Sequence, residues 1–121
     1  MSREELAGEL AAGTGVDAAG LALAHEPLPA AEVLSGAPTT ASHALATIDD
    51  TEIGIWEMTP GTASDTEVDE VFVVLSGRAT IEFVSPALPA LEVGPGSIVR
   101  LDEGMQTLWT VAETLRKVYI A

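Results

Sequence analysis

The 121-residue sequence contains no cysteine, and it has only two histidines and five basic residues. Without cysteine there is no disulfide framework, no thiolate metal site and no cysteine nucleophile. Nineteen acidic residues give a net charge of −14. Because a chain this acidic repels phosphate backbones and anionic lipid surfaces, we expect neither a nucleic-acid partner nor a membrane partner.

Long apolar segments are also missing. There is no run of about 18 apolar residues, which a membrane-spanning helix would need. No basic region followed by an apolar stretch opens the chain, since Glu4 and Glu5 follow Arg3 directly. We therefore expect a cytoplasmic protein. The length fits one domain, and a hydrophobic content of 47% is sufficient for a core without disulfides.

The first residues have the pattern of a short helix. Ser2 and Glu5 have capping-box spacing, which predicts a helix over about residues 3–12. A second helical turn is expected over residues 18–24, and prolines follow it. The expected division is an N-terminal arm, helical or flexible, over residues 1–27, and a single barrel domain over residues 28–121.

After residue 30 the pattern changes to short apolar runs separated by turn residues. This spacing is typical of an all-β sandwich or barrel. No helix-length pattern intervenes, so we expect antiparallel strands rather than parallel crossovers. Strands are predicted over residues 31–34, 42–48, 52–58, 67–76, 79–84, 90–93, 97–101, 106–111 and 115–120.

The predicted strand over residues 67–76 is apolar on both faces. Phe72 and Val74 point to one side, and Val71 and Val73 point to the other. Such a strand is expected to be buried on both faces. The covering element would be another sheet, the N-terminal arm or a second subunit, and we expect a homodimer.

Two motifs of fixed residue spacing lie within the predicted strand region. Six residues separate Glu70 from Gly77, and Gly96 is followed by Asp102 and Gly104 at the spacing of a second motif. The pair resembles the two motifs of the cupin superfamily, with Asp102 in the place of a proline. The resemblance implies a small antiparallel jelly-roll barrel, also called a double-stranded β-helix.

A further set of short segments lies between residues 28 and 121. They are Gly54-Ile55-Trp56-Glu57, Pro60-Gly61, Asp69-Glu70-Val71, Val74-Leu75-Ser76-Gly77-Arg78, Gly94-Pro95-Gly96-Ser97, Trp109-Thr110-Val111, Glu113-Thr114 and Arg116-Lys117-Val118-Tyr119. Together they resemble the ureidoglycine aminohydrolase-type cupins in their short single-domain form. This resemblance implies a hydrolase or lyase that acts on a small ureide, amine or carbonyl compound with a bound metal.

The residues at the expected metal positions do not match that chemistry. A metal-dependent cupin has two histidines before the glutamate and one in the second motif, and these positions are Ser64, Thr66 and Thr107 here. Glu70 alone cannot hold a transition metal tightly, because such sites need at least three protein ligands. We expect no cofactor. A hard cation such as Ca²⁺ stays open, because acidic oxygens are frequent between Ser64 and Glu70.

The candidate site follows from the same barrel. Glu70 is the candidate catalytic acid–base group, and the alternative is that Arg116 or a hydroxyl pairs with it. Arg116 and Lys117 are adjacent and face opposite ways, and we expect Arg116 to point inward. The expected pocket-lining residues are Trp56, Ser64, Thr66, Phe72, Thr107, Trp109, Arg116 and Tyr119.

Three functions are consistent with these patterns. The first is a cupin-fold protein that binds a small polar molecule in the barrel without a tightly bound metal. The second is a hydrolase or lyase similar to ureidoglycine aminohydrolase. The third is a non-catalytic dimeric structural module, in which the aromatic residues simply fill a small barrel.

Overall fold

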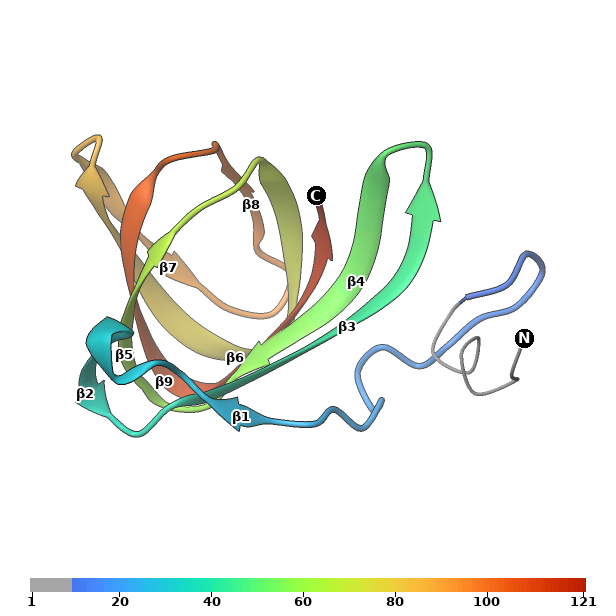
Figure 1. Ribbon diagram of the computed structural model, residues 1–121, viewed down its shortest axis with the longest axis horizontal. Helices are drawn as coiled ribbons and strands as arrows, with labels where there is room; N and C mark the ends of the chain where they lie inside the picture. The colour runs from blue at the N-terminus through green and yellow to red at the C-terminus, as the bar shows by residue number, and fades with distance from the viewer. Residues whose placement is uncertain (1–9) are drawn as a thin grey trace.

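Two long strands, β6 (Glu70–Ser85) and β9 (Gln106–Ile120), form the centre of the fold in the computed structural model, which describes residues 10–121 (Figure 1). They pair antiparallel along most of their lengths. The other edge of β9 carries β4 (Thr51–Met58) beside its C-terminal half and β5 (Gly61–Thr66) beside its N-terminal half. A turn between β4 and β5 therefore divides one edge of β9 between two strands.

The remaining strands extend this sheet on both sides. Along the other edge of β6 lie β8 (Ile98–Leu101) and β7 (Leu88–Val93). On the opposite side of the sheet, β4 pairs with β3 (Thr39–Ile48) to form a long hairpin, and β5 pairs with β2 (Val33–Gly36). The other elements on that side are β1 (Glu26–Pro27) and η1 (Ala30–Glu32).

Gly77 marks the corner at which the sheet folds over on itself. The β6–β9 register shifts repeatedly between Val74 and Ala79, which is the sign of β-bulges that bend a strand. Gly77 has a φ of +89°, and a Cβ there would collide with the backbone carbonyl of Thr114 on β9. The bend divides the paired β6–β9 ribbon into two halves, which form two walls of an all-β jelly-roll half-barrel (Figure 1).

The strand prediction is confirmed for most of the sheet. Residues 31–32, predicted as part of a strand, belong instead to η1, and β1 was not predicted. The runs predicted over residues 67–76 and 79–84 are one strand, β6, and the last two runs are also one strand, β9. β5 was missed, because its sequence of small and polar residues resembles a loop. β5 becomes a strand because it pairs with β9 over six residues.

The hydrophobic core fills the closed end of the half-barrel. Alternate side chains of β6 and β9 point inward and are buried, as the period of two predicts. The centre of this core consists of Met58, Phe72, Val74, Ile81, Leu101, Trp109, Val111 and Leu115.

The outer face of the sheet is apolar but only partly covered. Val73 of β6 lies between Val118 of β9 and Ile98 of β8, and Val71 lies beside Ile120. Ile98 is 71% exposed. Within one chain, residues 10–121 cover this face of β6 only partly, and the expected second subunit stays a prediction. We call these five residues the outer apolar patch.

The N-terminal segment differs from the expected helical arm. Most of the helix predicted over residues 3–12 lies outside the described residues. Within residues 18–24 there is a single turn at residues 18–20 rather than a helix, and the Asp17 carbonyl accepts hydrogen bonds from Gly20 and Leu21. Glycines and alanines dominate this segment, so it has no apolar stripe that would stabilise a helix on the barrel.

Residues 10–121 contain no α-helix. None of their helical segments has the length and hydropathy that a membrane-spanning helix requires.

Candidate functional site

Lys117 lies at the centre of the candidate site. Its Nζ is 2.7 Å from Oε2 of Glu70, and the two side chains are only 6% and 8% exposed. The same ammonium lies 4.2 Å from the ring centroid of Phe72, 4.7 Å from that of Trp56 and 4.9 Å from that of Trp109. Ring faces attract cations, so three rings and a carboxylate hold this charge.

The expectation that Arg116 points inward is wrong. Trp109 and Lys117 are eight residues apart on β9, so they have the same parity and face the same side. The bulges near the corner of the sheet do not reverse this parity. Lys117 therefore faces the barrel interior, and Arg116 lies on the outside of the sheet.

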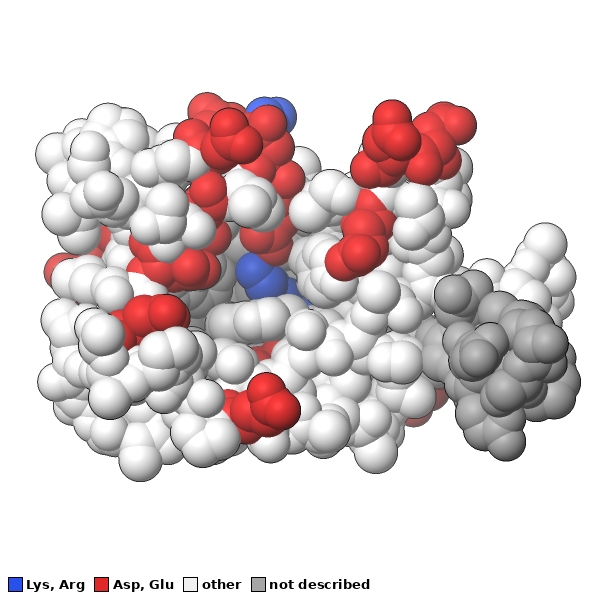
Figure 2. Space-filling model, in the orientation of Figure 1, with Lys and Arg blue, Asp and Glu red and all other residues white. Residues whose placement is uncertain are grey.

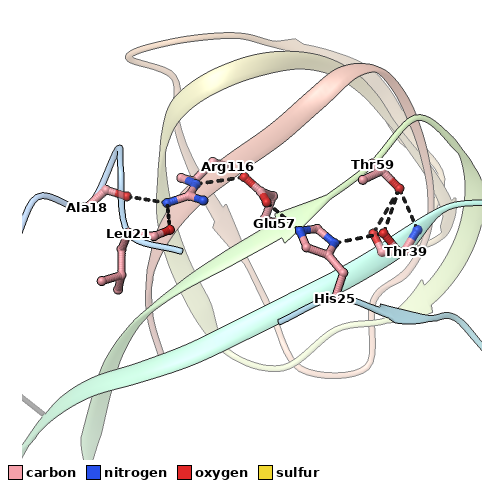
Figure 3. Close-up of polar contacts among 7 residues, drawn as sticks. All are labelled: Ala18, Leu21, His25, Thr39, Glu57, Thr59 and Arg116. Atoms are coloured by element: carbon pink, nitrogen blue, oxygen red, sulfur yellow. Dashed lines mark hydrogen bonds and ion pairs between the residues drawn. The ribbon is translucent and has the colours of Figure 1, made fainter. Parts of the chain in front are cut away.

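Arg116 is buried nonetheless, because the N-terminal segment covers it. Its Nε donates to Oε1 of Glu57 at 2.9 Å, and its Nη1 donates to the carbonyls of Ala18 and Leu21 at 2.9 and 2.7 Å (Figure 3). His25 Nε2 lies 2.6 Å from the other oxygen of Glu57. Burial opposes ionisation of Glu57, but the hydrogen bonds from Arg116 and His25 outweigh it and lower the pKa of this carboxyl.

A second buried carboxylate, Glu67, lies between β5 and β6. Its Oε2 accepts hydrogen bonds from Thr107 Oγ1 at 2.6 Å and from Trp109 Nε1 at 3.0 Å. Asp65, which pairs with Thr107 in the β5–β9 register, also lines the cavity, at an exposed position. Burial and the negative charge of Glu67 raise the pKa of Asp65 to about 6.

Tyr119 completes the polar wall. Its hydroxyl donates to Oε2 of Glu52 at 2.6 Å. The ring lies so close to Gly54 that any side chain at this position would collide with it. Burial and the hydrogen bond to Glu52 raise the pKa of Tyr119, so the phenol stays protonated and acts as a donor.

These groups surround an open cavity of about 370 Å³ at one end of the half-barrel. The cavity has four carboxylates in its wall against one ammonium. Figure 2 shows the basic atoms at the bottom of a hollow with acidic side chains around it. Side chains therefore do not fill this end of the barrel. The charged residues of the wall are Glu52, Asp65, Glu67, Glu70 and Lys117.

The predicted site residues fall into three groups. Trp56, Thr66, Glu70, Trp109 and Tyr119 line the cavity. Phe72 is fully buried below the Lys117 ammonium, and Thr107 is buried against Glu67. Ser64 and Arg116 lie elsewhere: Ser64 Oγ is 3.4 Å from the Glu32 carbonyl, to which it donates, and Arg116 is on the outer face.

The donor set does not fit the metal that the cupin resemblance implies. Thr107 donates its hydroxyl to Glu67, and Glu70 is paired with Lys117. Among residues 10–121, no three His, Cys, Asp or Glu side chains are grouped so that they could hold a metal ion. The Lys117 ammonium is the cation beside Glu70.

Three charged side chains of the cavity wall were not among the predicted site residues: Asp65, Glu67 and Lys117. The signal for Lys117 was available, because it shares the parity of Trp109 along β9. The position of Asp65 depends on the pairing of β5 with β9, which no local pattern indicated.

Comparison with known proteins identifies a family that this chain matches. Residues 46–119, more than half of the chain, match the family model of the EutQ-like cupin domain. The Clostridium difficile EutQ protein is 20% identical with a TM-score of 0.58, and the alignment covers 69% of this chain and 67% of that one. No curated protein matches the sequence.

Two other solved structures have the same fold. A protein of unknown function from Pseudomonas syringae pv. tomato is 24% identical over 84% of this chain, with a TM-score of 0.70. This chain spans only 44% of that protein's length. A cupin superfamily protein from Desulfitobacterium hafniense is 16% identical with a TM-score of 0.55, over 68% of this chain and 75% of that one. At these identities the likeness establishes the fold.

Proposed function

Because the chain belongs to the family of EutQ-like cupin domains, we propose that it binds a small polar molecule in the open end of its barrel. The observation that carries this proposal is the cavity of about 370 Å³ with charged and aromatic groups in its wall. That volume lies within the range of small-molecule sites, roughly 300–1,000 Å³. Apolar surfaces with a few fixed polar groups are typical of such sites.

The ligand would lie over the Lys117–Glu70 pair. Trp56 and Trp109 offer ring surfaces, and Tyr119 and Glu52 offer a hydrogen-bonded pair at the rim. Lys117 and Glu70 hold each other at 2.7 Å, so this part of the wall is ordered before a ligand arrives. Preorganised groups lose little entropy on binding, which favours affinity for a small ligand.

Intrinsic tryptophan fluorescence tests the proposal directly. The chain has two tryptophans, and both line the cavity. We expect at least one compound from a panel of ureides, amines and organic acids to change the fluorescence saturably and to raise the Tm. Trp109→Phe should weaken that binding. If no compound in the panel changes either signal, the proposal is wrong.

A second candidate is acid–base catalysis on the same small molecules, as the resemblance to ureidoglycine aminohydrolase-type cupins implies. The observation that favours it is the Lys117–Glu70 pair, in which a proton donor and an acceptor meet at the cavity wall. Ammonia release from ureides, measured with wild-type protein and Glu70→Gln, tests this function. Activity that survives Glu70→Gln would exclude Glu70 from the reaction.

We also propose that two copies associate through the outer apolar patch. The support is the exposure of Ile98 and Ile120 beside Val73 and Val118 on a continuous sheet face. An exposed apolar surface of this kind often marks a protein interface.

A further inference from the structure

Resting on the function proposed above, we infer that the ligand of this cavity is a small organic cation, a primary amine, whose ammonium binds between the carboxylates of Asp65 and Glu67. The hydrocarbon part of the amine would lie against the indole of Trp109. The inference concerns the class of ligand, whereas the proposed function concerns only whether a small molecule binds here.

The first observation is an excess of acceptors in the cavity wall. Lys117 is committed to Glu70, and Tyr119 is committed to Glu52. Both hydrogen bonds that described residues donate to the Glu67 carboxylate reach Oε2, which leaves Oε1 without a donor from these residues. A ligand that supplies N–H donors and positive charge therefore matches the wall, and an anion does not.

The second observation concerns the burial of Glu67. This residue is only 5% exposed, so little water reaches it. Yet among the described residues no fully buried polar side-chain atom lacks a hydrogen-bond partner. Oε1 is therefore not fully enclosed, and because Glu67 lines the cavity, a ligand atom there can reach it. A buried carboxylate with one oxygen facing a cavity is a strong partner for an ammonium group.

The third observation is that the same wall already holds an ammonium group. Lys117 Nζ is recognised by the Glu70 carboxylate together with the faces of three aromatic rings. Trp109 belongs to both places, because its ring contacts Lys117 while its Nε1 donates to Glu67. The donated hydrogen bond fixes the indole against the carboxylate that would hold the ligand.

Charge repulsion between Asp65 and Glu67 supports the same ligand. The raised pKa of Asp65 has its causes in burial and in the negative charge of Glu67. A bound ammonium would remove that repulsion and favour the ionised carboxylate. Binding of an amine should therefore weaken below about pH 6, as Asp65 takes up a proton.

A matched series of four-carbon compounds tests the inference on the full chain at pH 7.5. The series is n-butylamine and 1,4-diaminobutane as cations, 1-butanol as the neutral compound and butyrate as the anion, with CaCl2 as a metal control. Tryptophan fluorescence and calorimetry measure the affinity. We expect both amines to bind at least tenfold more tightly than 1-butanol and butyrate.

Two variants and a control locate the binding. Asp65→Asn and Glu67→Gln should each weaken amine binding at least tenfold, because each removes one negative charge from the proposed contact. Glu82→Gln removes the same charge from an exposed position on β6 and should leave the affinity unchanged. Circular dichroism and the Tm establish that all three variants are folded.

Several results would overturn the inference. Equal affinity for 1-butanol or butyrate, or Ca²⁺ binding that depends on Asp65 without amine binding, would exclude an amine as the ligand class. Those results would leave the proposed function standing, because a small molecule or ion would still bind in the cavity. Amine binding that Asp65→Asn and Glu67→Gln do not change would place the amine elsewhere. If no compound of this series or of the wider panel binds, both proposals are wrong.

Discussion

At the level of single residues, the Lys117 ammonium is buried and contacts one carboxylate and three aromatic rings. Removing two charges from water is costly, and the attraction between Lys117 and Glu70 repays this cost only while both partners are present. Cation–π contacts with Trp56, Phe72 and Trp109 add to the attraction. The pair is therefore a sensitive point for mutation.

We expect Lys117→Met to lower the free energy of unfolding by about 3–5 kcal/mol, because Glu70 would be left as a buried unpaired charge. Glu70→Gln in the Lys117→Met background should recover a large part of this loss. Urea unfolding of the two single variants and the double variant measures the coupling. Additive losses would show that the pair contributes nothing beyond its separate side chains.

Asp65 gives the stability a distinctive pH dependence. Its pKa is raised to about 6 in the folded chain, above the ordinary value of 3.8, so the folded state binds this proton more tightly than the unfolded state. The proton favours folding at low pH. This contribution is lost as the pH rises from about 4 through 6.

Asp65→Asn should therefore stabilise the protein at pH 7–8 by on the order of 1 kcal/mol, a figure that allows for solvent screening of this partly exposed side chain. The gain should disappear below about pH 4, where the wild-type carboxyl is protonated. Urea unfolding at several pH values measures it. Asp50→Asn, at an exposed turn, is the control and should stay within about 0.5 kcal/mol. A gain at pH 7 that persists at pH 4 would contradict the prediction.

At the level of elements, Arg116 fastens the N-terminal segment to the sheet. The guanidinium joins β9 to Glu57 on β4 and to the carbonyls of Ala18 and Leu21 (Figure 3). Leu10 adds a backbone hydrogen bond to Leu45 of β3. A segment without regular structure is thus held by a few charge-assisted hydrogen bonds, each worth about 1.5–3 kcal/mol.

We expect Arg116→Met to raise hydrogen exchange and proteolysis within residues 10–24 and to lower the free energy of unfolding by about 2–4 kcal/mol. Arg78→Met is the matched control, since Arg78 forms an exposed ion pair with Glu113 at 3.8 Å. The control should change stability by less than about 1 kcal/mol. If both variants behave alike, Arg116 does not fasten the segment.

Two glycines allow the cost of backbone strain to be distinguished from the cost of close packing. Gly77 lies at the corner of the sheet, and Gly96 lies between β7 and β8. Gly77 and Gly96 have the same φ of +89°, but a Cβ at Gly77 would collide with Thr114, whereas one at Gly96 meets nothing within 4 Å. Gly96→Ala should cost about 1–2 kcal/mol, which is the cost of the left-handed conformation. Gly77→Ala should cost clearly more, by thermal or urea unfolding. Equal costs would mean that the corner relaxes freely.

At the level of the whole molecule, the outer apolar patch is an apolar surface that the described residues cover only partly. We expect a dimer by light scattering in solution, with Val73→Lys giving a monomer because it buries a charge in the interface. Leu88→Lys, at an exposed position 47% accessible on β7, is the control and should remain dimeric. A wild-type monomer at all concentrations would contradict the prediction.

The sequence by itself determined the class of fold and most of the strands. Alternating apolar residues and turn residues act locally, so they indicate strands without knowledge of the partners. The two spaced motifs also supported the cupin resemblance, and the first, from Glu70 to Gly77, lies within one bent strand, β6. Trp56 and Trp109 were both predicted to line the pocket, and both line the cavity.

Only the tertiary structure decided the chemistry of the site. β5 is a strand because β9 pairs with it, and that pairing, which joins residues more than 40 positions apart, brings Asp65 beside Thr107. Whether Arg116 or Lys117 faces the barrel depends on how side chains alternate along β9 past the corner at Gly77, where the β6–β9 register shifts. Strand propensity is a local property, whereas register and the facing of a charged side chain are set by long-range pairing and by the cost of burying an unpaired charge.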